Sequence, residues 1–104
     1  LGMLVVRRGP NAGSTFALEG ETTTLGRHPD SDIFLDDVTV SRRHAEFRRS
    51  GTDFSVADLG SLNGTFCDGS RIDGELRLTD GAEVQVGKFR FTFFASRFDL
   101  AEEL

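Results

Sequence analysis

The sequence predicts an all-β fold, a two-sheet antiparallel β-sandwich of about ten to eleven short strands. Short runs rich in β-branched and aromatic residues alternate at period two, turn residues recur roughly every 6 to 12 positions, and helical periodicity is almost absent. The 104 residues, 38% of them hydrophobic and ten of them Phe, suffice for one core. We expect one domain over residues 1–96 and an acidic tail or short helix over residues 97–104.

Turn clusters separate the expected strands of the first half. A β-branched run ends at the cluster Gly9–Gly13, after which we expect a hairpin-like return. Pro29 keeps the residue before it out of the α region, so His28–Asp32 is expected to be a loop. The expected strands are residues 4–6, 15–18, 22–25, 33–35 and 45–48.

The second half begins with the clearest hairpin, in which the turn Ser50–Asp53 returns the chain to residues 54–58. Asn63-Gly64 and Asp68–Ser70 mark further tight turns. The other expected strands are residues 65–67, 71–72, 75–78, 83–86 and 89–93. The last one places Phe89, Phe91 and Phe93 on one face. We interpret this face as core rather than a nucleic-acid platform, because the chain is acidic and has no Tyr or Trp.

The formal net charge of -5 disfavours binding to nucleic acid or an anionic membrane. A site for an anionic ligand would have to be a local exception, and residues 41–49 provide one, with four arginines and one glutamate. Within this stretch, we expect Arg48 and Arg49 to act as rim charges that tune salt dependence.

The sequence gives no sign of a membrane segment, metal or cofactor. No apolar run reaches the roughly 18 residues of a membrane helix. The acidic stretch Asp30–Asp37 lacks the glycine and terminal glutamate of a calcium-binding EF-hand. Cys67 is the only cysteine, which excludes a disulfide framework within the chain and favours a reducing, cytoplasmic setting.

Three polar clusters lie at strand-to-loop junctions: Gly26-Arg27, Ser41-Arg42-Arg43-His44 and Ser61–Thr65. Loops gather at the two ends of a sandwich, so these clusters can converge at one end. A serine hydroxyl beside guanidinium groups suits a doubly charged oxyanion, because arginine presents planar charged donors that match phosphate.

The ordered set Gly26-Arg27, Ser41-x-x-His44 and Asn63-Gly64 resembles the signature of the forkhead-associated (FHA) domain, and the match extends over essentially the whole chain. The resemblance implies a β-sandwich that binds phosphothreonine peptides. Longer stretches of the sequence, Arg8–Gly13 and Gly26–Pro29 through to Phe47, also resemble a small group of actinobacterial proteins. Its members regulate central carbon and glutamate metabolism under the control of Ser/Thr kinases.

Carried over residue by residue, the resemblance implies that Arg27 and Ser41 bind phosphate oxygens. Arg42 would join them through its side chain or backbone N–H, and Asn63 would hydrogen-bond the main chain of the peptide. The resemblance gives loop-architecture roles to Gly26, His44, Gly64 and Thr65.

The resemblance implies that the protein is not an enzyme. Its implied partners are phosphothreonine-containing peptides or proteins, a Ser/Thr protein kinase and metabolic enzymes. One alternative is a scaffold that docks a folded partner enzyme through a sheet face, independently of phosphate. The other is a hydrolase using Ser41, His44 and Asp58, although no nucleophile elbow surrounds Ser41 and no oxyanion donors are identifiable.

Overall fold

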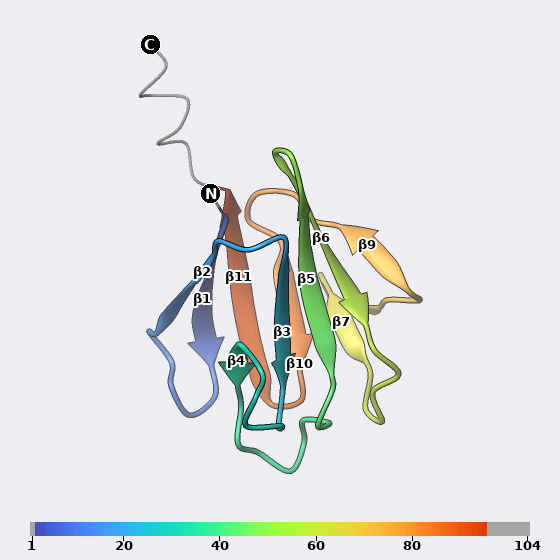
Figure 1. Ribbon diagram of the computed structural model, residues 1–104. Coiled ribbons are helices and arrows are strands. Elements are labelled where there is room, and N and C mark those ends of the chain that lie inside the picture. The colour runs from blue at the N-terminus through green and yellow to red at the C-terminus, as the bar shows by residue number, and fades with distance from the viewer. Residues whose placement is uncertain (1, 96–104) are drawn as a thin grey trace.

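The computed structural model describes residues 2–95, which form eleven strands in two sheets facing each other (Figure 1). The six-stranded sheet has, in spatial order, β2 (Thr15–Leu18), β1 (Gly2–Arg8), β11 (Phe89–Ala95), β10 (Glu83–Val86), β7 (Thr65–Cys67) and β8 (Ser70–Arg71). The five-stranded sheet has β4 (Ile33–Phe34), β3 (Thr22–Gly26), β5 (Ala45–Ser50), β6 (Asp53–Asp58) and β9 (Glu75–Arg77). The predicted all-β sandwich is confirmed. The tail or helix expected over residues 97–104 lies outside the described residues.

One strand pair departs from the expected antiparallel pattern. β3 and β4 are parallel, with Leu25 opposite Ile33 and Gly26 opposite Phe34. In the loop between them, the Asp32 carboxylate accepts hydrogen bonds from the backbone N–H (2.9 Å) and the hydroxyl (3.2 Å) of Thr24. The Asp32 N–H in turn donates to the Thr24 hydroxyl at 2.9 Å. These contacts close the loop between the two strands.

The hairpins follow their turn residues. β5 and β6 pair from Ala45 opposite Asp58 to Ser50 opposite Asp53, as expected. Between β7 and β8, Asp68 and Gly69 have φ values of 50° and 86°, the positive values that a two-residue hairpin turn requires.

The core lies between the sheets and contains the three aligned phenylalanines of β11. Phe89, Phe91 and Phe93 are 2%, 0% and 1% exposed, so the interpretation of this face as core is confirmed. Phe93 also packs against Phe54 of the opposite sheet, with ring centroids 5.3 Å apart. Burial of these rings from both sheets gives the loops a rigid support.

Three loops gather at one end of the sandwich, the lower end in Figure 1. They are the β3–β4 loop (residues 27–32), the β4–β5 loop (35–44) and the β6–β7 loop (59–64), and the β10–β11 turn (87–88) reaches the same end. All three predicted polar clusters therefore lie together at this end.

Among residues 2–95, no helix is long and apolar enough to cross a membrane.

Candidate functional site

The β3–β4 and β4–β5 loops run side by side because β3 ends in glycine. A Cβ on Gly26 would lie 2.1 Å from the carbonyl oxygen of Arg42, so no larger residue fits without displacing backbone. Next to this contact, the N–H of Arg27 donates to the carbonyl of Ser41 at 3.0 Å, and the N–H of His28 donates to that of Arg42 at 3.2 Å. The two clusters that contain Arg27 and Ser41 are thus in direct backbone contact.

Arg27 is oriented by one hydrogen bond to the neighbouring loop. Its Nε donates to the carbonyl of Val40 at 3.0 Å, and its terminal guanidinium nitrogens have no partner among residues 2–95. Arg42 is exposed, and its side chain likewise has no partner within this range. Both arginines therefore have donors available for a ligand.

His44 joins the β4–β5 loop to the β6–β7 loop. The side chain is 0% exposed, its Nδ1 accepts the N–H of Ser41 at 3.1 Å, and its Nε2 donates to the carbonyl of Gly64 at 2.9 Å. These partners require the neutral ring with its proton on Nε2. Burial lowers the pKa of His44, although the Gly64 hydrogen bond and the charge of Asp58 act to raise it.

Ser41 and Asn63 each contact the loop opposite. The N–H of Leu62 donates to the Ser41 hydroxyl at 3.0 Å, which leaves the hydroxyl hydrogen free to bind an acceptor. Asn63 Nδ2 donates to the carbonyl of Thr39 at 3.0 Å, and its side-chain oxygen has no partner among the described residues. The third predicted cluster is therefore tied to the second, and unused polar groups lie at the junction.

Asp58 organises the β6–β7 loop. Its Oδ1 accepts the hydroxyls of Ser61 (2.6 Å) and Thr65 (2.7 Å), and its Oδ2 accepts the N–H groups of Gly60 (3.0 Å) and Ser61 (3.1 Å). Burial alone would raise the pKa of Asp58, but these hydrogen bonds outweigh burial and lower it. From the sequence, we expected Asp58 only as the third member of a hydrolase triad. The signal for this turn was an aspartate with serine three residues later.

The end of this loop is closely packed. Gly64 has φ +87°, and a Cβ there would lie 2.7 Å from Nε of Arg71. Thr65 is 0% exposed and anchors the start of β7 through Asp58. Both residues therefore fix the backbone from which Asn63 projects.

The hydrogen bonds do not assemble a catalytic triad. Both ring nitrogens of His44 are bonded to backbone groups, and the Ser41 hydroxyl is bonded to the N–H of Leu62. Asp58 holds a turn rather than the imidazole. In this arrangement His44 is not placed to take a proton from Ser41.

Among residues 2–95, no group of three or more His, Cys, Asp or Glu side chains is placed to hold a metal ion.

The three clusters at the loop end match a known domain family. The model of the FHA domain matches residues 23–87, which span all three clusters. The chain belongs to the FHA domain family.

Curated relatives of this FHA domain are actinobacterial. It is 63% identical over 91 residues to the oxoglutarate dehydrogenase inhibitor of Corynebacterium jeikeium, covering 88% of this chain and 62% of the relative. It is 64% identical over 91 residues to the glycogen accumulation regulator GarA of Mycolicibacterium smegmatis, covering 88% and 57%. The chain thus spans about three fifths of the length of these relatives.

Solved FHA structures have the same fold. An FHA domain studied for phosphothreonine-dependent interactions is 30% identical with a TM-score of 0.82, over 91% of this chain and 96% of that one. Mycobacterium tuberculosis EmbR in complex with a low-affinity phosphopeptide is 34% identical with a TM-score of 0.85, over 91% of this chain and 24% of that one.

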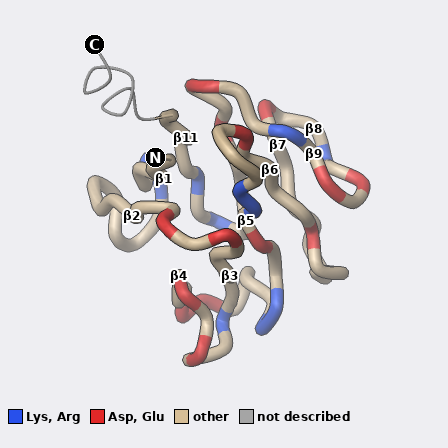
Figure 2. The backbone as a smooth tube through the Cα atoms, turned by 45° about the horizontal axis from the view of Figure 1, so that its top comes forward, with Lys and Arg blue, Asp and Glu red and all other residues tan. Residues whose placement is uncertain are grey.

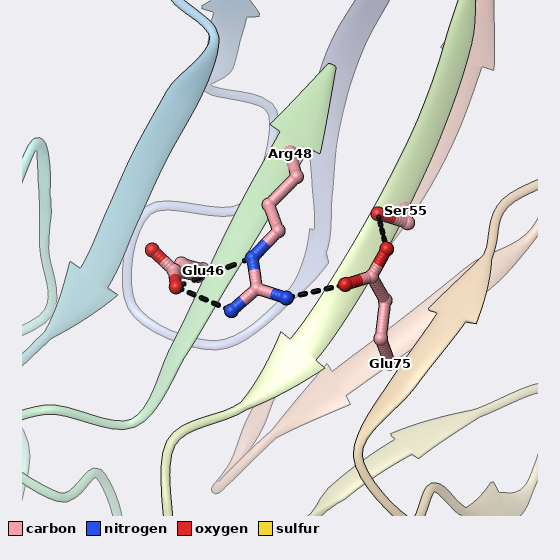
Figure 3. A network of polar contacts seen from close by, with 4 residues as sticks. All are labelled: Glu46, Arg48, Ser55 and Glu75. Carbon is pink, nitrogen blue, oxygen red and sulfur yellow. Dashed lines mark hydrogen bonds and ion pairs between the residues drawn. The ribbon is translucent and has the colours of Figure 1, made fainter. Parts of the chain in front are cut away.

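The charges of the FHA domain are mixed around the loop end. Acidic and basic segments alternate along the chain near β3 and β4 (Figure 2). Arg48, which we expected to act as a rim charge, lies on the outer face of the five-stranded sheet and pairs there with Glu46 and Glu75 (Figure 3). It is three residues beyond the start of β5, about 10 Å along the strand. Hydrogen bonds from Ser55 and then from Arg48 lower the pKa of Glu75. Arg48 is therefore neutralised away from the loops.

Two apolar side chains stand out in these polar loops. Val38 is 89% exposed and Leu62 is 86% exposed, and each is adjacent in sequence to a member of the Thr39–Asn63 hydrogen bond. Neither residue stands out in the sequence, because a single apolar residue in a loop carries no periodic signal. Both side chains are therefore exposed to solvent next to the Thr39–Asn63 contact.

Proposed function

We propose that this FHA domain is a non-enzymatic module that binds phosphothreonine peptides at its loop end. The observation that carries the proposal is the convergence of Arg27, Ser41 and Arg42 from adjoining loops, each with unused hydrogen-bonding groups. Arg27 and Ser41 bind phosphate oxygens, and Arg42 adds its side chain or N–H. Asn63 binds the peptide main chain through its free side-chain oxygen.

The chemistry of phosphate suits these groups. A phosphothreonine carries a charge of about -1.5 to -2 near pH 7 and three strong acceptor oxygens. Guanidinium and hydroxyl donors form short, charge-assisted hydrogen bonds with such oxygens. Because the whole chain carries a net charge of -5, these local donors have to outweigh an unfavourable global field.

Gly26, His44, Gly64 and Thr65 serve this site as loop architecture in the proposal. Gly26 allows the approach of the β3–β4 and β4–β5 loops, and His44 ties the Ser41 backbone to Gly64. Neither has to contact the peptide. Their roles are supported by burial and by the hydrogen bonds that they make.

We further propose that the protein acts in cytoplasmic Ser/Thr-kinase signalling and regulates a metabolic enzyme. This rests on the names of its relatives, one an inhibitor of oxoglutarate dehydrogenase and another a regulator of glycogen accumulation. The partners would then be a phosphothreonine-containing protein, a Ser/Thr protein kinase and a metabolic enzyme.

The phosphate pocket is tested by calorimetric titration of one phosphothreonine peptide, selected from a degenerate library, into matched variants. We expect Arg27→Ala to weaken binding by about 2 to 5 kcal/mol, the range for removing one side of a close charge pair. Ser41→Ala should cost about 1 to 3 kcal/mol. The control Arg48→Ala removes the same charge from the sheet face and should leave affinity within about twofold. Equal losses in Arg27→Ala and Arg48→Ala would reject the pocket.

A further inference from the structure

The β4–β5 loop is fastened to the β10–β11 turn by three residues, Asp37, Thr39 and Lys88, here called the latch. The N–H of Lys88 donates to the Thr39 hydroxyl at 3.0 Å, and its Nζ pairs with Oδ1 of Asp37 at 2.9 Å. The other carboxylate oxygen of Asp37 accepts the N–H of Thr39 at 2.8 Å and also the Thr39 hydroxyl. The Thr39 hydroxyl therefore donates one hydrogen bond, to Asp37, and accepts one, from the N–H of Lys88.

The turn that carries Lys88 is itself fixed. Val86 and Phe89 pair across it, so Gly87 and Lys88 form a two-residue connection between buried strands. Gly87 has φ +56°, and a Cβ there would lie 2.3 Å from the Thr39 hydroxyl and 2.8 Å from its carbonyl oxygen. This close approach holds the β4–β5 loop against the opposite sheet, through residues Thr39 and Lys88 that are 49 positions apart in the sequence.

The latch matters because consecutive carbonyls beside it hold two residues of the proposed site. The carbonyl of Thr39 accepts Asn63 Nδ2 at 3.0 Å, and that of Val40 accepts Arg27 Nε at 3.0 Å. Among residues 2–95 these are the only hydrogen bonds made by either side chain. The orientation of both ligand-binding groups therefore depends on where the latch places residues 39 and 40.

We propose that Asp37, Thr39 and Lys88 are positioning residues for phosphopeptide binding. They hold the carbonyls of Thr39 and Val40 so that Asn63 presents its side-chain oxygen to the peptide backbone and Arg27 presents its terminal nitrogens to phosphate. None of the three has to touch the ligand. The inference rests on the proposed function of the loop end.

An ordinary stabilising role makes a different prediction from this one. If the latch only stabilised the fold, its loss would lower the free energy of unfolding but would leave the peptide affinity of the folded protein unchanged. A positioning role lowers the affinity of protein that remains fully folded, because Asn63 and Arg27 then have to be ordered when the ligand binds.

The test compares Thr39→Val, which keeps the shape but removes the hydroxyl, with Thr39→Ser, which keeps the hydroxyl. Lys88→Met is a second variant that removes the ion pair, and Arg77→Met is its control, because Arg77 pairs with Asp53 on the outer sheet face at 2.7 Å. Each variant is first shown to be folded by its melting curve. A phosphothreonine peptide and its unphosphorylated twin are then titrated by calorimetry.

We expect Thr39→Val and Lys88→Met to weaken phosphopeptide binding about five- to tenfold, while Thr39→Ser and Arg77→Met stay within about twofold of wild type. In an Asn63→Ala background, the loss caused by Thr39→Val should shrink, because one of the two positioned groups is gone. If Thr39→Val does not fold, the affinity of Lys88→Met relative to Arg77→Met tests the positioning role by itself.

Wild-type affinity in both folded latch variants would overturn the inference while leaving the proposed function standing. Equal loss in Thr39→Val and Thr39→Ser would also overturn it, since the hydroxyl would then be irrelevant. If wild type binds the phosphorylated and unphosphorylated peptides alike, the proposed function itself fails.

Discussion

Replacing His44 by alanine should destabilise the domain, because this side chain bonds two loops from a fully buried position. The substitution removes the partner of the Gly64 carbonyl, which is buried, and that of the Ser41 N–H, which is partly buried. A buried polar group left without a partner costs about 1 to 3 kcal/mol, and the emptied ring volume adds to this. We expect a total of about 3 to 5 kcal/mol, a large part of the 5 to 15 typical of a domain.

Urea denaturation of His44→Ala, monitored by far-UV circular dichroism, measures this loss of unfolding free energy. His28→Ala is the matched control, since His28 is only half-buried and its Nδ1 accepts one local hydrogen bond, from Asp30. That variant should stay within about 1 kcal/mol of wild type. If His44→Ala unfolds at the wild-type urea concentration but no longer binds phosphopeptide, His44 is a ligand-contacting residue and the architectural assignment is wrong.

Three further predictions concern pH, packing and ligand. Because burial lowers the folded-state pKa of His44, its contribution to stability is complete above the unfolded pKa of about 6.5 and is lost as pH falls below it. The unfolding free energy should therefore fall between pH 7.5 and 5.5 in wild type and His28→Ala; a flat profile in both would contradict this. Gly26→Ala should lower stability by about 1 to 3 kcal/mol and abolish measurable peptide binding, since its Cβ meets the Arg42 carbonyl; unchanged binding in calorimetry would refute the packing argument. A matched phosphoserine peptide should bind about fourfold or more weakly than phosphothreonine, as it lacks a methyl group worth about 0.8 kcal/mol; equal dissociation constants would refute this.

The sequence predicted most of the strands because their signal is local. Alternation and turn residues mark β5, β6 and β11, and the structure moves their ends by at most a few residues. The parallel pairing of β3 with β4 was missed, and it is accompanied by hydrogen bonds between Asp32 and Thr24 that close the loop between the two strands. Short-range patterns do not reveal which polar side chain a loop will fold around.

The same reasoning explains what was and was not foreseen at the loop end. The three clusters were visible as fragments of a spaced signature, and the fold brings them together. The latch was not visible, since Asp37 and Lys88 are distant in sequence and each resembles an ordinary surface charge. The pairing of Arg48 with Glu75 was hidden in the same way, because it depends on the register of β5, β6 and β9.

The most direct test of the central claim is to follow backbone amide chemical shifts while a phosphothreonine peptide and its unphosphorylated twin are added in turn. The account predicts shifts at Ser41, Arg42 and Asn63 with the phosphorylated peptide only, and none at Arg48 or Arg77 on the outer sheet face. Shifts confined to that face, of equal size with both peptides, would contradict the account and favour a scaffold that docks its partner independently of phosphate.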